Sequence, residues 1–208
     1  MTESERQFRA HLSDCTLCLQ NYDSTGHYFS LRHVWVASVS AFDWYLTELV
    51  PEVGLQLIDR TPRVLTANLQ RVEVPLGDLL ELDRLNPAEK LIFVQEHIFL
   101  SIQYKSFYRP DKVSEALSYI LTCPSKEKWG RILARLKITG RYDSRTEQDI
   151  RDELTLIGDR RDLISHSVDI TPGTKTVNPA RRDDAARVIE FIGDLVRAID
   201  EETERQLA

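Results

Sequence analysis

The chain has 208 residues, of which 42% are hydrophobic and 29% are charged, and this composition excludes a disordered or fibrous protein. A chain of this length can bury one substantial core, so we expect a single domain spanning residues 1–208. The net charge of -6 excludes nucleic-acid binding by bulk positive charge but is compatible with a local cluster of arginines.

The first residues are polar, and no apolar run reaches the length of a bilayer span, so we expect a cytoplasmic protein without membrane contact. The 3 cysteines cannot all pair, which favours reduced thiols. Cys15 and Cys18 form a C-x-x-C pair, but no second ligand pair follows at a zinc-site spacing. We therefore expect neither a metal nor a cofactor, and we expect Cys15 to share a buried helical stripe with Phe8 and Leu12.

Helical periodicity dominates the chain and predicts an all-α fold, because glycine and proline fall between the periodic segments. The first helix is predicted over about residues 5–21. The second is predicted over about residues 30–50, where Pro51 ends it. Residues 51–83 have the weakest pattern, and we predict an irregular insertion there.

Capping signals mark the later helices. Asn86, Pro87 and Glu89 are typical of a capping box that begins a helix, and this helix is predicted to continue to about residue 107. Two further helices are predicted over about residues 110–121 and about residues 125–139.

The last two helices have similar signals at their starts. Ser144 and Glu147 are consistent with a second capping box, and the helix that follows is predicted to continue to about residue 166. The Asn178-Pro179 pair is predicted to begin the last helix. Its expected buried stripe comprises Ala185, Val188, Ile192, Leu195 and Ile199.

The helix predicted from residue 144 carries an arginine on its apolar stripe. The other members of that stripe are Ile150, Leu154, Ile157, Ile164 and Val168. Because a buried guanidinium is costly unless a carboxylate or a phosphate receives it, Arg161 is a candidate functional residue. The alternative is a structural ion pair with an acidic residue such as Asp43.

Two side chains near Arg161 could take part in chemistry. Asp162 precedes His166 by four residues, a spacing that lets a carboxylate accept a hydrogen bond from the imidazole and set its tautomer. His166 lies about 140° around an ideal helix from Arg161. The two converge only if the helix ends near Ser165 or if a second subunit supplies one of them. The alternative for His166 is a surface histidine near a helix C-terminus.

The hexapeptide Arg161-Asp162-Leu163-Ile164-Ser165-His166 resembles the R-x4-H signature of HEPN domains. The segment Ser40-Ala41-Phe42-Asp43-Trp44-Tyr45-Leu46 resembles the early helix of that family. The segment Ser106-Phe107-Tyr108-Arg109-Pro110-Asp111-Lys112-Val113 is similar to the helix break in the RiboL-PSP-HEPN branch. The order of elements matches over most of the chain outside residues 51–83.

This resemblance implies an antiparallel helical bundle that forms a homodimer, in which two R-x4-H motifs line one cleft. It implies metal-independent cleavage of an RNA substrate, in which the ribose 2′-OH attacks the adjacent phosphate. His166 would act as general base or acid, and Arg161 would neutralise charge on the phosphate oxygens. Asp162 would orient His166, and Asp43 would position Arg161. Many relatives are toxins or antiviral effectors, so an antitoxin or regulatory protein is another expected partner.

Four further residues are weaker candidates. Arg160 and Ser165 flank the motif and are candidates for RNA contact, although solvated side chains are the simpler interpretation. Arg181 and Arg182 are candidates for phosphate contact. The alternative for these two is a charged helix face balanced by the aspartates that follow them.

Two other functions remain open at this stage. One is a catalytically inactive HEPN module that binds a partner protein or a nucleotide. The other is a generic helical adaptor, in which Arg161 closes a buried ion pair and the protein is a monomer. The presence of both Arg161 and His166 favours the enzyme, whereas the acidic balance and Asp162 favour the inactive module.

Overall fold

Helices make up most of the described structure. The computed structural model describes residues 1–60, 65–171 and 173–208. Over these ranges it contains eight α-helices, two short 3-10 helices and one isolated bridge between Ile170 and Val177, and the predicted all-α fold is confirmed. The α-helices are α1 (Glu3–Thr25), α2 (Tyr28–Arg60), α3 (Leu76–Leu82), α4 (Pro87–Ile102), α5 (Pro110–Ile120), α6 (Lys128–Lys137), α7 (Glu147–Ser167) and α8 (Arg182–Leu207).

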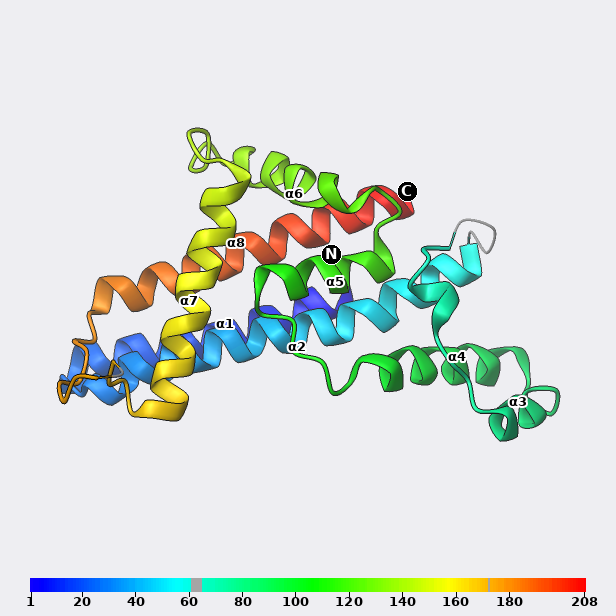
Figure 1. Cartoon of the computed structure of the whole chain (residues 1–208), viewed down its shortest axis with the longest axis horizontal. Coiled ribbons are helices and arrows are strands. Elements are labelled where there is room, and N and C mark those ends of the chain that lie inside the picture. Colours follow the sequence, from blue (N-terminus) through cyan, green and yellow to red (C-terminus); the bar gives the residue numbers. More distant parts are fainter. Residues whose placement is uncertain (61–64, 172) are drawn as a thin grey trace.

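Three long helices, α1, α2 and α8, form the centre of the fold, and each contacts the other two. In Figure 1, α1 runs back along α2, whereas α8 follows the direction of α2. The helix α7 crosses α2 steeply, α6 lies along α8, and α4 lies along the second half of α2. The middle of α7 is therefore held against the central helices, and its last turns, which carry the motif, extend past them.

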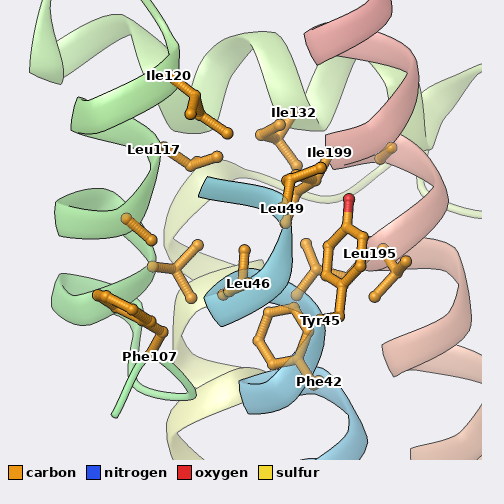
Figure 2. Close-up of a cluster of buried hydrophobic side chains, with 14 of the residues drawn as sticks. Phe42, Tyr45, Leu46, Leu49, Phe107, Leu117, Ile120, Ile132, Leu195 and Ile199 are labelled. Atoms are coloured by element: carbon orange, nitrogen blue, oxygen red, sulfur yellow. The ribbon is translucent and has the colours of Figure 1, made fainter. Parts of the chain in front are cut away.

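The core is built around the middle of α2, because α1, α4, α5, α7 and α8 all pack against this helix. Figure 2 shows α2 side chains meeting residues of α5, α6 and α8 and of the loop before α5. Burying each large apolar side chain contributes roughly 1.5–3 kcal/mol. The labelled side chains, all completely buried, are Phe42, Tyr45, Leu46, Leu49, Phe107, Leu117, Ile120, Ile132, Leu195 and Ile199.

The prediction that Pro51 ends the second helix is wrong, because α2 continues through it to Arg60. A proline inside a helix costs about 3 kcal/mol through a lost hydrogen bond and a steric clash. Val53 and Leu57, two and six residues further on, are buried, and their burial offsets that cost. The predicted insertion is also less irregular than expected, because it contains α3 and the 3-10 helix η1 (Leu69–Arg71).

The predicted stripes and caps are confirmed in part. The Asn86 capping box is present, and Cys15 is buried, as is the whole stripe of α8. The second capping box is formed by Thr146 and Asp149 instead of Ser144 and Glu147.

The last helix begins at Arg182 rather than at the Asn178-Pro179 pair. The main-chain N–H of Asn178 and its side-chain amide both donate to the main-chain oxygen of Asp169, at 2.8 and 2.9 Å. These bonds hold the segment before α8 against the end of α7, in a conformation that is not helical. These tertiary contacts explain why the last helix begins after the position predicted from the sequence.

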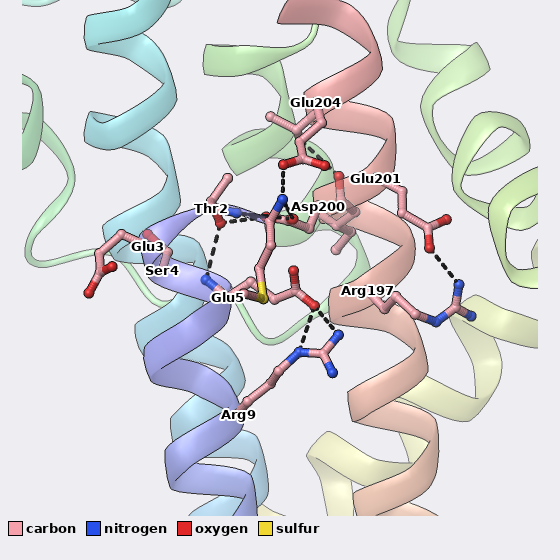
Figure 3. A network of polar contacts seen from close by, with 12 residues as sticks. Thr2, Glu3, Ser4, Glu5, Arg9, Arg197, Asp200, Glu201 and Glu204 are labelled. Carbon is pink, nitrogen blue, oxygen red and sulfur yellow. Dashed lines mark hydrogen bonds and ion pairs between the residues drawn. The ribbon is translucent and has the colours of Figure 1, made fainter.

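The start of α1 is joined to the end of α8 by a buried polar network (Figure 3). Thr2 caps α1 by accepting a hydrogen bond from the Glu5 main-chain N–H, at 3.1 Å. The Thr2 main-chain N–H donates to the Asp200 carboxylate at 3.2 Å. Glu5 and Asp200 are only 4% and 2% exposed, so two carboxyl groups are buried close together.

Glu5→Gln is expected to change the pH dependence of stability. Burial, followed by the neighbouring Asp200 carboxylate, raises the pKa of Glu5, against an opposing effect of Arg9. Stability from a carboxyl whose pKa is raised is complete below its unfolded pKa of about 4.3 and is lost as pH rises through its folded pKa. Urea unfolding at pH 4 and pH 7 should therefore show the variant gaining stability relative to wild type as pH rises.

Glu3→Gln is the matched control, because hydrogen bonds from Arg6 and Gln7 lower the pKa of Glu3. A lowered pKa gives stability above about pH 4.3, so this variant should lose stability relative to wild type over the same interval. Equal pH dependence of the two variants would contradict the assignment of Glu5.

Candidate functional site

The loop between α4 and α5 is anchored to α2 by Asp43. The Asp43 carboxylate accepts a hydrogen bond from the Ser106 hydroxyl at 2.8 Å and another from the Phe107 main-chain N–H. The Phe107 side chain is completely buried in the core (Figure 2). These contacts explain why α4 ends at Ile102 instead of continuing to residue 107.

Two residues of the anchored loop reach the motif on α7. The Tyr108 hydroxyl donates to the Asp162 carboxylate at 3.0 Å. Arg109 donates to Asp162 at 2.5 Å through Nη2 and to Asp159 through Nη1. Gly158 leaves room for this guanidinium, because a Cβ there would lie 3.2 Å from the Arg109 Cζ. The loop and the motif are thus joined by a network centred on Asp162.

Arg161 also belongs to the network centred on Asp162. Its Nη1 donates to Asp162 at 3.1 Å, and its guanidinium lies 5.1 Å from the centre of the Tyr108 ring. The Arg109 guanidinium lies 5.3 Å from that ring, so one tyrosine contacts two cations. The Nε of Arg161 is buried and makes no hydrogen bond within the described chain.

The predicted environment of Arg161 needs correction. The buried stripe of α7 ends at Ile157, whereas Ile164 is half-buried and Val168 is exposed. The Arg161 side chain is 24% exposed, and its ion-pair partner is Asp162 instead of Asp43. Asp43 supports Arg161 only indirectly, through the loop that carries Tyr108. The reason is that α7 extends past the central helices, so its last turns are not covered.

The charges in this network are held in place at neutral pH. Burial would raise the pKa of Asp162, but hydrogen bonds from Arg161, Arg109 and Tyr108 lower it overall. Partial burial would lower the pKa of Arg109, but its hydrogen bonds to Asp159 and Asp162 raise it. Asp162 therefore stays ionised and holds both guanidiniums beside each other.

His166 is exposed and lies in a shallow cavity of about 380 Å³ beside this network. The other residues lining that cavity are Arg109, Asp159, Asp162, Leu163 and Ser167. Within the described chain, His166 makes no hydrogen bond or ion pair, and the predicted contact with Asp162 is absent because that carboxylate binds Tyr108, Arg109 and Arg161. The imidazole is therefore open to solvent and to a ligand.

Arg109, rather than Arg161, shares the cavity with His166. The helix continues to Ser167 before Val168 adopts a left-handed conformation, so Ser165 and His166 both lie inside α7 and the helix does not end between Arg161 and His166. The first of the two predicted ways for Arg161 and His166 to converge is thus absent. The second, a neighbouring subunit, is compatible with the exposure of His166.

The four weaker candidates lie in different places. Ser165 is exposed near the end of α7, and Arg182 forms an ion pair with Asp23 of α1. Arg160 and Arg181 line a separate cavity of about 340 Å³ between α2, α7 and α8. The motif and these two arginines therefore do not form one continuous pocket.

Asp169 was not identified from the sequence, although it holds the segment that follows the motif. Its side chain is completely buried and accepts from Arg32 Nε at 2.9 Å and from Arg160 Nη2 at 2.8 Å. Its backbone is left-handed, with φ of 64°, a conformation that aspartate tolerates better than most residues. An acidic residue directly after a helix end was the one available signal.

Tyr108 and Arg109 were also missed as site residues, since the sequence pattern marked them only as part of a helix break. The available signal was Arg109 at the N-cap of α5, directly before Pro110. Arginine is not a preferred N-cap, and its side chain makes no capping bond there. An arginine in that position can direct its guanidinium elsewhere, and here it binds α7.

Comparison of the chain with protein-family models, with curated proteins and with solved structures found no match. Among the described residues, no cluster of three or more His, Cys, Asp or Glu side chains could hold a metal ion. Nor does the described part of the chain contain a helix with both the length and the apolarity to cross a membrane. The interpretation of the site therefore rests on its own geometry and on the R-x4-H resemblance.

Proposed function

We propose that this protein is an endoribonuclease that cleaves RNA by attack of the ribose 2′-OH, without a metal ion. The observation that carries the proposal is the position of His166, which is exposed and unpaired in one cavity with the Arg109 guanidinium. A proton-transfer group next to a fixed cation is suited to phosphodiester cleavage, because one group moves the proton and the other stabilises charge on the phosphate. A role as a toxin or antiviral effector is part of this proposal and follows from the resemblance alone.

The proposed reaction uses few groups. His166 accepts the proton of the 2′-OH as the oxygen attacks phosphorus, and the P–O5′ bond breaks as a 2′,3′-cyclic phosphate forms. An imidazole is suited to this transfer because its charge changes near neutral pH. Arg109 in the same cavity, and Arg161 of the second subunit in the proposed homodimer, stabilise the negative charge on the nonbridging oxygens. The leaving 5′-oxygen takes its proton from the second His166 of a homodimer or from water.

Asp159 and Asp162 balance the positive charge of the two guanidiniums before RNA binds. Arg109 is bonded to both carboxylates, and Arg161 is bonded to Asp162. A phosphate must therefore share or displace contacts that already exist. We expect modest affinity that falls as salt rises, in agreement with the net charge of -6.

The test is incubation of the purified protein with a labelled single-stranded RNA in excess EDTA, followed by identification of the new ends. The expected products carry 5′-hydroxyl and 2′,3′-cyclic phosphate ends. An oligonucleotide of the same sequence with 2′-O-methyl groups should stay intact, because it lacks the attacking hydroxyl. Products with 5′-phosphate ends, or cleavage of the methylated strand, would contradict this mechanism.

A module that binds a partner protein without catalysis is the second candidate. It is favoured by apolar side chains that α3 and α4 leave exposed. Examples are Leu76 at 75%, Leu80 at 69% and Ile92 at 56% exposure. Clustered exposed apolar side chains often mark protein interaction surfaces. This candidate predicts no RNA cleavage in the experiment above, together with partner binding that Ile92→Ser weakens and His166→Ala does not affect.

A further inference from the structure

A second cavity lies on another face of α7, away from His166. It has a volume of about 340 Å³ and lies between Trp35 of α2, Leu156 and Arg160 of α7, and the start of α8. None of these side chains lines the cavity that contains His166. The two cavities nevertheless use consecutive residues of one helix, because Asp159 lines the first and Arg160 lines the second.

One wall of this cavity combines an aromatic ring, an apolar side chain and a guanidinium. The Arg160 guanidinium lies 5.9 Å from the centre of the Trp35 ring, and Leu156 beside it is 68% exposed. Arg160 is held by Asp169 and by the main-chain oxygen of Pro179, at 2.8 and 3.0 Å. Its Nε is buried without a hydrogen bond in the described chain. Aromatic rings and guanidinium planes are the surfaces on which unpaired bases stack.

The rim of the cavity offers a cation for a phosphate. Arg181 is exposed, precedes α8 and makes no ion pair with any described residue. The carboxylates that also line the cavity are already paired, Glu153 with Arg145 and Asp184 with Arg187. Arg181 is the N-cap residue of α8 and its side chain makes no capping bond, whereas Asp183 and Asp184 in the first turn offset the positive end of the helix dipole.

We propose that this second cavity is a subsite for one nucleotide of a single-stranded RNA, next to the cleavage site. The base lies against Trp35 and Leu156, and Arg181 binds its phosphate. Arg160 and His166 are six residues apart on α7, about 9 Å along the helix axis and about 120° around it, so a strand that reaches both cavities must pass around the helix. The ligand in this inference depends on the proposed function, whereas the cleavage chemistry does not enter it.

The first test is binding of a fluorescent 2′-O-methyl oligonucleotide, which cannot be cleaved by 2′-OH attack. Arg181→Gln is expected to weaken binding and to reduce the slope of log affinity against log salt by about one. Arg182→Gln is the matched control, since it removes the same charge from a side chain that already pairs with Asp23. Equal effects of the two variants would overturn the subsite.

A second variant tests whether a base stacks on Trp35. Trp35→Leu is expected to weaken oligonucleotide binding about 5-fold to 150-fold, the effect typical of losing one stacking contact. Because Trp35 also packs against the core, its folding is checked by urea unfolding, and Trp35→Phe should restore most of the affinity. Weak binding by Trp35→Leu that Trp35→Phe does not restore would count against stacking.

Competition with AMP separates a free nucleotide from a nucleotide within RNA. Competition by AMP that Arg181→Gln abolishes would show that the cavity accepts a single nucleotide. If AMP does not compete while Arg181→Gln still weakens oligonucleotide binding, the cavity requires an RNA strand. Wild-type protein that binds but does not cleave would retain the subsite and refute the nuclease. Cleavage of RNA by the wild type, together with no effect of Arg181→Gln on oligonucleotide binding, would refute the subsite and retain the nuclease.

Discussion

His166→Ala is expected to lower the single-turnover rate of RNA cleavage by about 10²–10⁴-fold, the usual contribution of a general acid or base. The side chain is exposed and makes no hydrogen bond within the described chain, so its removal should change the free energy of unfolding by less than about 0.5 kcal/mol. Loss of activity with unchanged stability would assign His166 to the chemistry rather than to the fold.

The measurement uses wild type and variant at equal concentration, with EDTA and one RNA substrate. His27→Ala is the matched control, because His27 is also exposed and lies in the turn between α1 and α2. It should cleave at the wild-type rate. Cleavage by His166→Ala at the wild-type rate would mean that another group, or a contaminating nuclease, carries out the reaction.

Asp169→Ala is expected to lower the free energy of unfolding by about 3 kcal/mol. Removing one member of a buried ion pair leaves its partner charged and unpaired, which costs about 3–5 kcal/mol. The lower end applies here, because the Arg32 and Arg160 side chains are 21% and 23% exposed and keep some contact with water. The left-handed backbone at this position adds strain for alanine.

Urea unfolding at pH 7 measures this effect. Asp183→Ala, at an exposed position in the first turn of α8, should change stability by less than about 0.5 kcal/mol. Asp169→Asn keeps the shape and the backbone preference but removes the charge, so it should fall between wild type and alanine. A loss below about 1 kcal/mol for Asp169→Ala would show that the two arginines find other partners.

Local signals in the sequence predicted much of the fold. The Asn86 capping box is confirmed because its hydrogen bonds join residues three positions apart. The buried stripe of α8 is confirmed because an amphipathic pattern specifies which face is covered. Pro51 was misinterpreted because the contacts that keep α2 helical beyond it come from other helices.

The sequence by itself identified the helical character of the chain and the motif with Arg161, Asp162 and His166, because helix periodicity and motif spacing are properties of neighbouring residues. Only the tertiary structure placed Tyr108 and Arg109 against Asp162 and made Arg109 the cation beside His166. Those contacts join segments about 50 residues apart, and their geometry depends on Asp43 anchoring the loop before α5. No local pattern encodes such contacts, because they form only when α2, α5 and α7 pack together.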